Sequence, residues 1–219
     1  MMGYTIEGLP KMPDAKPIVF VVDDDVSVRE SLEALIQVAG WETRAFDSAE
    51  AFLPNTRGQG PNCLVLDVNL PDLSGLDLQA MVARERAEMP IIFISGYGDV
   101  PKTVRAMRAG AIEFLTKPFS DEALLEAIRM ALERSKAAID ESVMLKTIRT
   151  RYASLSRRER EVMELVVTGL LNKQVGGKLG ISEITVKAHR GRVMEKMHAS
   201  SFAHLVRIGA KISFASAPN

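Results

Sequence analysis

The chain has 219 residues, of which 47% are hydrophobic and 26% charged, which is ordinary for a soluble globular protein. The longest purely apolar stretch near the amino terminus, residues 18–22, is far too short to span a bilayer. The single cysteine, Cys63, excludes an internal disulfide and a CxxC metal pair. Residues 1–16 lack the apolar core of a signal peptide, so we expect a flexible amino-terminal tail on a cytoplasmic protein with no membrane contact.

Charge is distributed unevenly along this neutral chain. Residues 151–219 carry 12 Lys and Arg against 5 Asp and Glu, a net charge of +7. Residues 1–150 hold the remaining 16 basic and 23 acidic residues, a net charge of −7. This asymmetry predicts two domains, of which the basic one faces a polyanion.

Five short apolar segments in the first half of the chain predict strands. Residues 18–22, 63–66 and 91–94 are continuous apolar runs, as in strands buried on both faces. Residues 42–46 and 113–116 form two weaker segments. The parallel arrangement follows from the helical patterns that separate them.

Those helical patterns cover residues 26–39, 48–53 and 75–88, and a further segment that is capped by Asp99 and ends at Gly110. Repeated strand-then-helix units predict a doubly wound parallel sheet with helices on both faces, an α/β fold.

The fifth helix of this series has no obvious end. It begins after Ser120, and no glycine or proline falls between Asp121 and Tyr152, which predicts a long connecting helix. Its apolar register slips near residues 134–138, so the sequence leaves open whether the helix is continuous or breaks there. Such spacing also occurs in coiled coils, in which this helix would pair with the same helix of a second chain.

Four short helices without strands follow, at residues 156–169, 172–179, 182–198 and 201–210. The middle two flank a turn at Gly180-Ile181, which is the arrangement of a helix-turn-helix. The whole chain is thus α/β plus all-α. The predicted parts are a tail (1–16), an α/β domain (17–134), a helical linker (135–152), an all-α domain (153–213) and a second tail (214–219).

Reactive side chains occur where the predicted strands end. Asp23 and Asp24 follow the first strand, Asp67 follows the third, Ser95 ends the fourth and Lys117 follows the fifth. The carboxyl ends of parallel strands meet at one edge of a sheet. Crowded carboxylates suit Mg²⁺, and a carboxylate can attack phosphorus while an ammonium and a hydroxyl stabilise the transferring oxygens. The sequence therefore predicts a phosphoryl-transfer site.

Four motifs resemble those of response-regulator receiver domains over about residues 17–134: VVDDD (21–25), LVLDVNLPDLSG (64–75), FISGYGD (93–99) and GAIEFLTKPF (110–119). The resemblance implies that Asp67 accepts the phosphoryl group and also binds the metal. It implies that Asp24 binds Mg²⁺ directly, Asp23 through metal-bound water and Asn69 through its backbone carbonyl.

The same resemblance assigns three further residues. Ser95 and Lys117 match the hydroxyl and the lysine that contact the phosphoryl group, and the Lys117–Pro118 bond is expected to be cis. Phe114 stands at the aromatic switch position. Asp25 is expected to be a surface or helix-cap residue.

Two segments, LSRREREVMELVVTGLLNKQV (155–175) and LGISEITVKAHRGRVMEKM (179–197), resemble the DNA-binding domain of NarL/FixJ-type (LuxR-type) regulators. One departure is Gly176-Gly177 in the first helix of the pair, where two glycines cost about 1–2 kcal/mol relative to alanine.

The second helix of the pair (182–198) is the expected recognition helix, and a helical wheel places Val186, Val193 and Met197 toward its core side. The opposite face carries Ile184, Ala188, Gly191, Arg192 and Glu195. Arg190 borders the core side, where it reaches at most a phosphate. The candidate DNA contacts are Lys173, Ser182, Thr185, Lys187, Ala188, Arg190, Gly191 and Arg192.

The combined resemblance implies a two-component response regulator that is not an enzyme, apart from slow autodephosphorylation. A sensor histidine kinase phosphorylates Asp67, and the chain then binds double-stranded DNA, as a homodimer or after release of the helix-turn-helix domain. RNA polymerase is a further expected partner.

Two alternatives fit less well. A haloacid-dehalogenase-like phosphatase would use Asp23 and Asp25, but it leaves Asp67 and the helix-turn-helix unexplained. A receiver that is never phosphorylated would be expected to have lost one of Asp24, Asp67 or Lys117.

Overall fold

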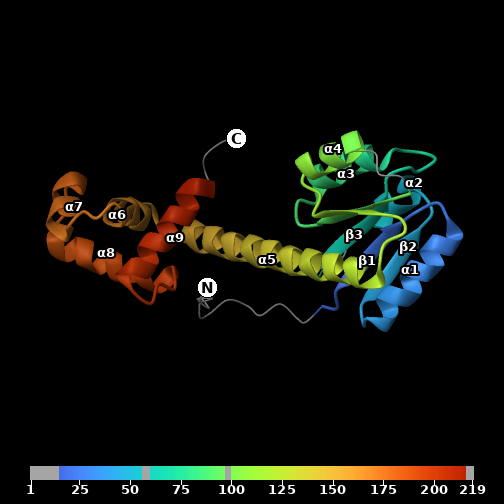
Figure 1. The fold of residues 1–219 in the computed structure, drawn as a ribbon. Coiled ribbons are helices and arrows are strands. Elements are labelled where there is room, and N and C mark those ends of the chain that lie inside the picture. The colour runs from blue at the N-terminus through green and yellow to red at the C-terminus, as the bar shows by residue number, and fades with distance from the viewer. Residues whose placement is uncertain (1–14, 56–59, 97–99, 216–219) are drawn as a thin grey trace. The chain divides into compact units, whose positions relative to one another are not determined.

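The computed structural model describes residues 15–55, 60–96 and 100–215 (Figure 1). The predicted cap Asp99 and most of the two predicted tails therefore lie outside the described residues. The chain divides into two compact units, with the boundary between Asp140 and Glu141. We call them the N-terminal unit and the C-terminal unit. Within the described part of the chain, no helix combines the length and the apolar character needed to cross a membrane.

The N-terminal unit is built on the five predicted strands. They are β1 (Ile18–Val22), β2 (Glu42–Phe46), β3 (Asn62–Asp67), β4 (Ile91–Ser95) and β5 (Glu113–Thr116). All neighbouring pairs are parallel, in the order β2-β1-β3-β4-β5. The predicted α/β fold is confirmed. Because β2 lies on one side of β1 and β3 to β5 lie on the other, the chain changes direction across the sheet after β2. The carboxyl ends of β1 and β3 therefore lie side by side at the centre of the sheet.

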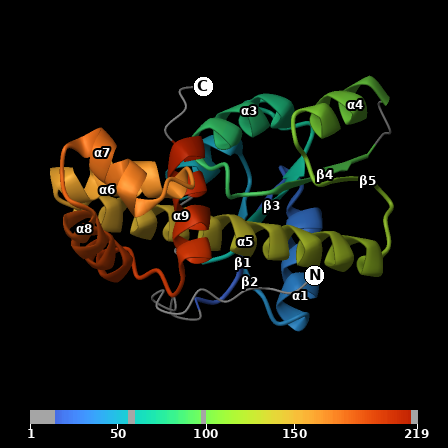
Figure 2. The same ribbon diagram turned by 90° about the vertical axis from the view of Figure 1, so that its left-hand side faces the viewer.

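Alternate residues of the central strands enter two separate cores, which is why these strands are continuously apolar. On one face, Phe20, Leu64 and Phe93 pack with α2 (Ala49–Phe52), α3 (Gly75–Glu85) and α4 (Val100–Arg108). On the other face, Val21, Cys63 and Val65 pack with α1 (Val26–Val38) and the first part of α5. Figure 2 shows α3 and α4 on one side of the sheet and α1 and α5 on the other. Trp41 is half-buried against the second core.

Helix ends differ from the prediction where proline or cap chemistry intervenes. The helix predicted to end at residue 88 ends at Glu85, because Arg86 is non-helical and a turn follows it, in which the Met89 N–H donates to the Arg86 carbonyl over 2.9 Å. The short helix α2 passes into a 3₁₀ turn, Leu53–Asn55, that contains Pro54. Asp25 is the N-cap of α1, where it accepts hydrogen bonds from the backbone N–H of Ser27 and Val28, as expected for a cap residue.

The predicted long helix is α5, which runs from Asp121 to Ala153 without the break considered at residues 134–138. Leu124, Ile128 and Leu132 belong to the second core of the N-terminal unit, whereas Ile148 belongs to the core of the C-terminal unit. The change of apolar register is therefore a change of packing partner and not a helix end.

The C-terminal unit contains α6 (Arg157–Val167), α7 (Asn172–Leu179), α8 (Glu183–Lys196) and α9 (Phe202–Ala215). Ser156 and Glu159 form a capping box at the start of α6, and the predicted turn at Gly180, with φ 68°, is confirmed. Helix α9 extends five residues beyond its predicted end at residue 210. The three positions predicted to face the core, Val186, Val193 and Met197, are fully buried.

The paired glycines of α7 have different environments. A Cβ at Gly176 would lie 2.7 Å from the carbonyl oxygen of Ile181, whereas a Cβ at Gly177 would meet nothing within 4 Å. Close approach of the turn to α7 thus requires Gly176, and Gly177 only weakens the helix.

We therefore expect Gly177→Ala to stabilise the C-terminal unit by about 0.5–1 kcal/mol, since alanine is the better helix former. Gly176→Ala should destabilise the unit by about 1–3 kcal/mol, because the backbone at Ile181 must move away from the added methyl group. Hydrogen exchange of the α7 amides measures both effects. Equal changes in the two variants would contradict this account.

Candidate functional site

Strand register brings the predicted site residues to one edge of the sheet. Val22 pairs with Leu66, so Asp23 and Asp67 leave neighbouring strands side by side. Asp67 pairs with Ile94, and Ser95 pairs with Thr116, which precedes Lys117. The edge is the carboxyl edge of the sheet, where the sequence predicted a site.

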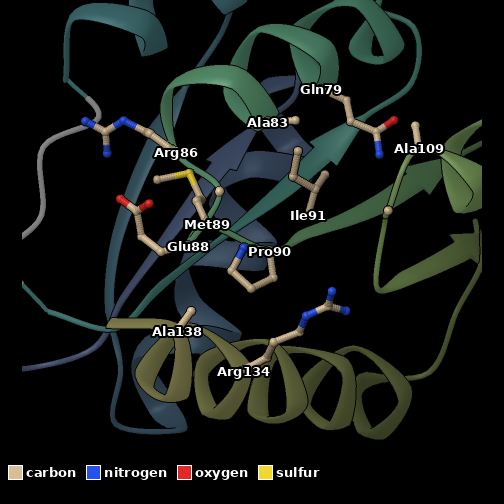
Figure 3. A pocket seen from close by; sticks show the side chains of 12 residues that line it. Gln79, Ala83, Arg86, Glu88, Met89, Pro90, Ile91, Ala109, Arg134 and Ala138 are labelled. Carbon is tan, nitrogen blue, oxygen red and sulfur yellow. The ribbon is translucent and has the colours of Figure 1, made fainter. Parts of the chain in front are cut away.

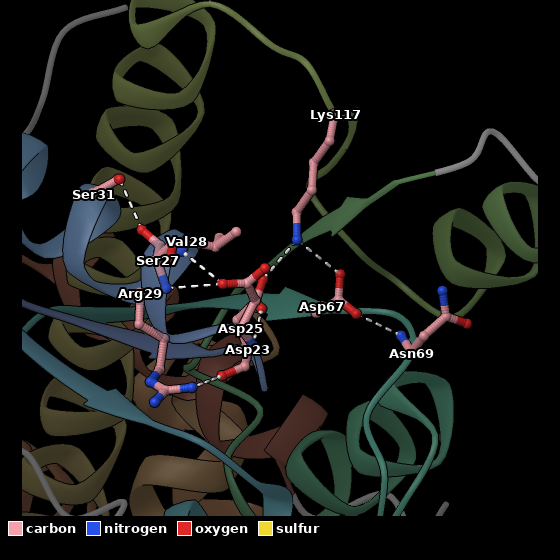
Figure 4. Close-up of polar contacts among 9 residues, drawn as sticks. All are labelled: Asp23, Asp25, Ser27, Val28, Arg29, Ser31, Asp67, Asn69 and Lys117. Carbon is pink, nitrogen blue, oxygen red and sulfur yellow. Dashed lines mark hydrogen bonds and ion pairs between the residues drawn. The ribbon is translucent and has the colours of Figure 1, made fainter.

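Lys117 joins the two buried carboxylates (Figure 4). Its Nζ donates to Asp23 Oδ2 over 2.7 Å and to Asp67 Oδ1 over 3.3 Å. The other oxygen of Asp67 accepts a 2.8 Å hydrogen bond from the backbone N–H of Asn69. Asp23 is 1% and Asp67 6% exposed, so both charges are largely removed from water. The Lys117–Pro118 bond is cis, as expected.

The electrostatics of this cluster are unbalanced. Burial raises the pKa of Asp67, and the charge of Asp23 adds to the rise, while the Asn69 N–H and the Lys117 ammonium oppose it. Burial by itself would lower the pKa of Lys117, but the hydrogen bond to Asp23 and the charges of both carboxylates raise it above its ordinary value. Two buried carboxylates share one ammonium, and a further cation would relieve the repulsion between them.

The remaining predicted site residues surround this cluster. Asp24 and Asn69 are exposed beside it, and Asn69 Oδ1 accepts a 3.2 Å hydrogen bond from Lys102 Nζ of α4. Ser95 is buried, and its carbonyl accepts a 2.7 Å hydrogen bond from the Lys117 N–H. Among the described residues, no three or more His, Cys, Asp or Glu side chains are already grouped as a metal site.

Phe114 lies on β5 and is half-buried. Its ring stacks on Phe93, with centroids 6.0 Å apart, and packs against the core beneath α4. The predicted switch aromatic is thus in contact with the strand that ends in Ser95.

Gly75 is a site residue that sequence reasoning did not identify. A Cβ at this position would collide with the carbonyl oxygen of Asp67 and lie 3.1 Å from Val68 Cα. The Gly75 N–H also donates to Val68 O over 3.0 Å. The start of α3 therefore rests directly on the backbone of Asp67. A glycine at the start of a predicted helix was the only sequence signal.

Pockets formed by described residues adjoin the sheet at both of its ends. One, of about 510 Å³, lies next to the cluster and is lined by α1 and by Lys117, Pro118 and Phe119. The other, of about 230 Å³, lies at the opposite edge around Pro90 and Ile91 and contains none of the predicted site residues (Figure 3). The first pocket gives the cluster an accessible neighbouring surface.

The C-terminal unit presents the second candidate site on α8. Lys187, Ala188, Gly191 and Arg192 are exposed, as is Lys173 at the start of α7. Ser182 caps α8 by accepting a hydrogen bond from the Thr185 N–H, and their hydroxyls lie 2.8 Å apart. The outward face of α8 thus carries basic side chains at Lys187 and Arg192 and small residues at Ala188 and Gly191.

Arg190 occupies a different environment from the other candidate contacts. Its guanidinium lies 4.4 Å from the Phe202 ring centroid, and Nη1 donates to Asn172 Oδ1 over 3.2 Å. These contacts link α8 to α7 and α9. The structure therefore places the guanidinium in packing contacts inside the unit, where we had expected at most a phosphate contact.

Glu159 fixes the far end of α8. It is buried, and its Oε2 accepts from Lys196 Nζ and from the Ser156 N–H, over 2.7 and 2.8 Å. These interactions, the Lys196 bond foremost, lower the pKa of Glu159 below its ordinary value.

Glu159→Gln should therefore destabilise the C-terminal unit by about 1–2 kcal/mol at pH 7, since the amide keeps the cap but loses the charge-assisted bond. A carboxyl group whose pKa is lowered by folding stabilises the folded state at pH values above its unfolded pKa of about 4.3. This stabilisation is lost as the pH falls through the pKa of the folded state. Hydrogen exchange of α6 and α8 amides should show the two proteins converging in acid. A difference independent of pH would rule out the ion pair as its source.

An acidic cluster with a lysine at the carboxyl edge of a doubly wound sheet, followed by a helix-turn-helix unit, defines a two-domain signalling regulator. Residues 19–129 match the response regulator receiver domain, and residues 153–208 match the bacterial regulatory proteins of the luxR family. The chain belongs to the response regulators of this two-domain type, which act as transcriptional regulators. The phosphatase alternative receives no support.

Relatives match over nearly the whole chain. Nodulation protein W of Bradyrhizobium diazoefficiens is 49% identical, over 92% of this chain and 88% of its own. Response regulator protein TmoT of Ectopseudomonas mendocina is 43% identical, over 94% and 93%. The solved structure of response regulator StyR is 46% identical, with a TM-score of 0.80 over 90% of this chain and 100% of its own.

Proposed function

We propose that this response regulator accepts a phosphoryl group on Asp67 from a sensor histidine kinase and thereby controls binding of double-stranded DNA by its C-terminal unit. The observation that carries the proposal is the Asp23–Lys117–Asp67 cluster. An oxygen of Asp67 attacks phosphorus while the bond from phosphorus to the donor breaks, and Lys117 stabilises charge on the transferring oxygens. The sequence has no ATP-binding pattern of its own, which supports a separate kinase as the donor in the cell.

Mg²⁺ fits the residues at this edge. All the available donors are oxygens, from the carboxylates of Asp23, Asp24 and Asp67 and the carbonyl of Asn69, and hard cations prefer such ligands. The shortage of positive charge beside the two buried carboxylates favours a dication. When bound, Mg²⁺ would neutralise charge on the phosphoryl oxygens.

Phosphorylation adds about −1.5 to −2 charges next to Ser95. A hydrogen bond from the Ser95 hydroxyl to the phosphoryl group would pull the end of β4 toward Asp67. That movement would shift the backbone hydrogen bond between Ser95 and Lys117 and the packing of Phe93 on Phe114. We propose that this change alters the face formed by α4, β5 and α5. Val100, Val104 and Met107 are exposed apolar side chains on α4, which supports homodimerisation through that face.

Dimerisation would present two recognition helices to a two-fold-symmetric operator in the cytoplasm, where RNA polymerase is a further partner. Slow autodephosphorylation would end the signal. Lys173, Ser182, Thr185, Lys187, Ala188, Gly191 and Arg192 are the proposed DNA contacts.

The test measures DNA affinity and oligomeric mass of the full chain with and without beryllofluoride and Mg²⁺. We expect the mass of a dimer and tighter operator binding with the mimic. Tighter binding at unchanged monomer mass would favour release of the C-terminal unit. No change in either quantity would contradict the proposal.

A further inference from the structure

The C-terminal unit carries large apolar side chains outside its core. In the described part of the C-terminal unit, two are strongly exposed: Ile184 at 82% and Leu171 at 70%. Leu171 precedes α7, whereas Ile184 stands in the first turn of α8. Neither contributes to the core of its unit, so the fold does not explain Ile184.

Ile184 belongs to the outward face of α8. Exposed residues recur there at Ile184, Lys187, Ala188, Gly191, Arg192 and Glu195, with the spacing of one side of a helix. A Cβ at Gly191 would meet nothing within 4 Å, so the centre of the face is open. We call these six residues the outward stripe.

The position of Ile184 along α8 is as informative as its exposure. A recognition helix contacts base edges mainly with its amino-terminal residues, and Ile184 is the second residue of α8, after the cap Ser182. Ala188 and Gly191, further along the stripe, are small enough to let the helix backbone approach the bases. In a helix docked in this way, the first turn would be the part that lies against the base edges.

Two basic side chains identify the kind of surface that this stripe meets. Lys187 and Arg192 outnumber Glu195, the one acidic side chain of the stripe, and suit a polyanion. A protein-docking surface would gain little from a single apolar side chain at one end of a row of solvated charges. Charge therefore favours DNA as the occupant.

We propose that Ile184 packs against the C5 methyl group of a thymine and so selects a T·A pair at one position of each half-site. An isoleucine side chain has no hydrogen-bonding group, and the thymine methyl is the apolar group that the major groove displays. Against any other base, the isoleucine side chain would shield the hydrogen-bonding groups of the base edge from water without forming hydrogen bonds to them. The inference rests on the proposed DNA binding and names one base that it reads.

The experiment begins with selection of binding sites from random double-stranded DNA by the full chain with beryllofluoride and Mg²⁺. Each thymine of the selected site is then replaced singly by deoxyuridine, which removes only the methyl group. Affinities are measured for the natural protein, for Ile184→Ala and for Leu171→Ala. The last variant truncates the other exposed apolar side chain of the unit and is the matched control.

At one thymine position of the half-site, we expect uracil to weaken binding by the natural protein about fourfold, the effect of one buried methyl group. Ile184→Ala should bind the thymine site several-fold more weakly and lose nothing further with uracil. Leu171→Ala should keep the full uracil effect, which separates the contact from any change in DNA shape.

Three outcomes would overturn the inference. Uracil could be tolerated at every position by the natural protein, the uracil effect could persist in Ile184→Ala, or Ile184→Ala could bind as tightly as the natural protein. Failure to enrich any site would instead remove the proposed DNA binding itself. Because Ile184 is exposed, its truncation leaves the core of the unit intact.

Discussion

Replacing Asp67 with asparagine is expected to abolish phosphoryl uptake. The amide has no anionic oxygen to attack phosphorus. Among the residues that the structure describes, no second carboxylate has the same contacts, with Lys117 Nζ on one oxygen and the Asn69 N–H on the other. Incubation with acetyl phosphate and Mg²⁺, followed by intact mass spectrometry, measures the added group. Undiminished labelling of the variant would remove Asp67 from its proposed role.

Asp25→Asn is the matched control. Asp25 lies next to the site residues Asp23 and Asp24, but its carboxylate caps α1, a role that asparagine also fills. We expect this variant to be labelled like the natural protein. Loss of labelling in both variants would mean that the effect of Asp67→Asn is not specific to the acceptor position.

Stability distinguishes a lost nucleophile from a lost fold. Since the folded pKa of Asp67 is raised, ionisation of this carboxyl costs stability as pH rises above the unfolded value of about 3.9. Asp67→Asn removes that cost, so the variant should be more resistant to urea than the natural protein at pH 7, and the advantage should vanish in acid. Fluorescence of Trp41, the single tryptophan, follows unfolding of the N-terminal unit.

Gly75→Ala is expected to destabilise the N-terminal unit by about 3 kcal/mol, because the new methyl group meets backbone and not a flexible side chain. The carbonyl of Asp67 or the start of α3 must move, and either shift displaces the acceptor carboxylate from Lys117. Slower phosphorylation should therefore accompany the lower stability. Urea unfolding followed by Trp41 and acetyl phosphate labelling measure the two effects.

Gly96→Ala is the control for this substitution. Gly96 follows β4 at the same edge of the sheet, but a Cβ there would meet nothing within 4 Å. The free energy of unfolding of the Gly96→Ala variant should differ from that of the natural protein by less than about 0.5 kcal/mol. If Gly75→Ala were equally harmless, close packing of α3 on Asp67 would not constrain the site.

Much of the fold could be predicted because each central strand is apolar on both faces. Phe20 and Val21 enter different cores, so the strand shows no alternation, and the parallel sheet follows. Helix ends were less predictable. Glu88 fits the helical pattern of α3, but the helix ends earlier because Arg86 is already non-helical, and the sequence pattern does not mark that position. The register slip in α5 was visible in the sequence, but its cause, two separate cores, was not.

The acidic edge could be predicted because strand ends converge by topology. Asp23, Asp67 and Lys117 needed only the sheet order to be brought together. What the sequence did not reveal depends on contacts between distant segments. Gly75 rests on Asp67 across a loop, and Arg190 stacks on Phe202 of the following helix, and no local pattern encodes either contact.

The buried thiol of Cys63 has a practical consequence. Burial in the sheet raises its pKa, so it stays a neutral thiol shielded from alkylating reagents while the N-terminal unit is folded. A cysteine introduced on the surface would then be the one reactive site for a fluorescent or spin label, with no need to replace Cys63. Conversely, the rate at which Cys63 itself is alkylated would report how often the central sheet opens.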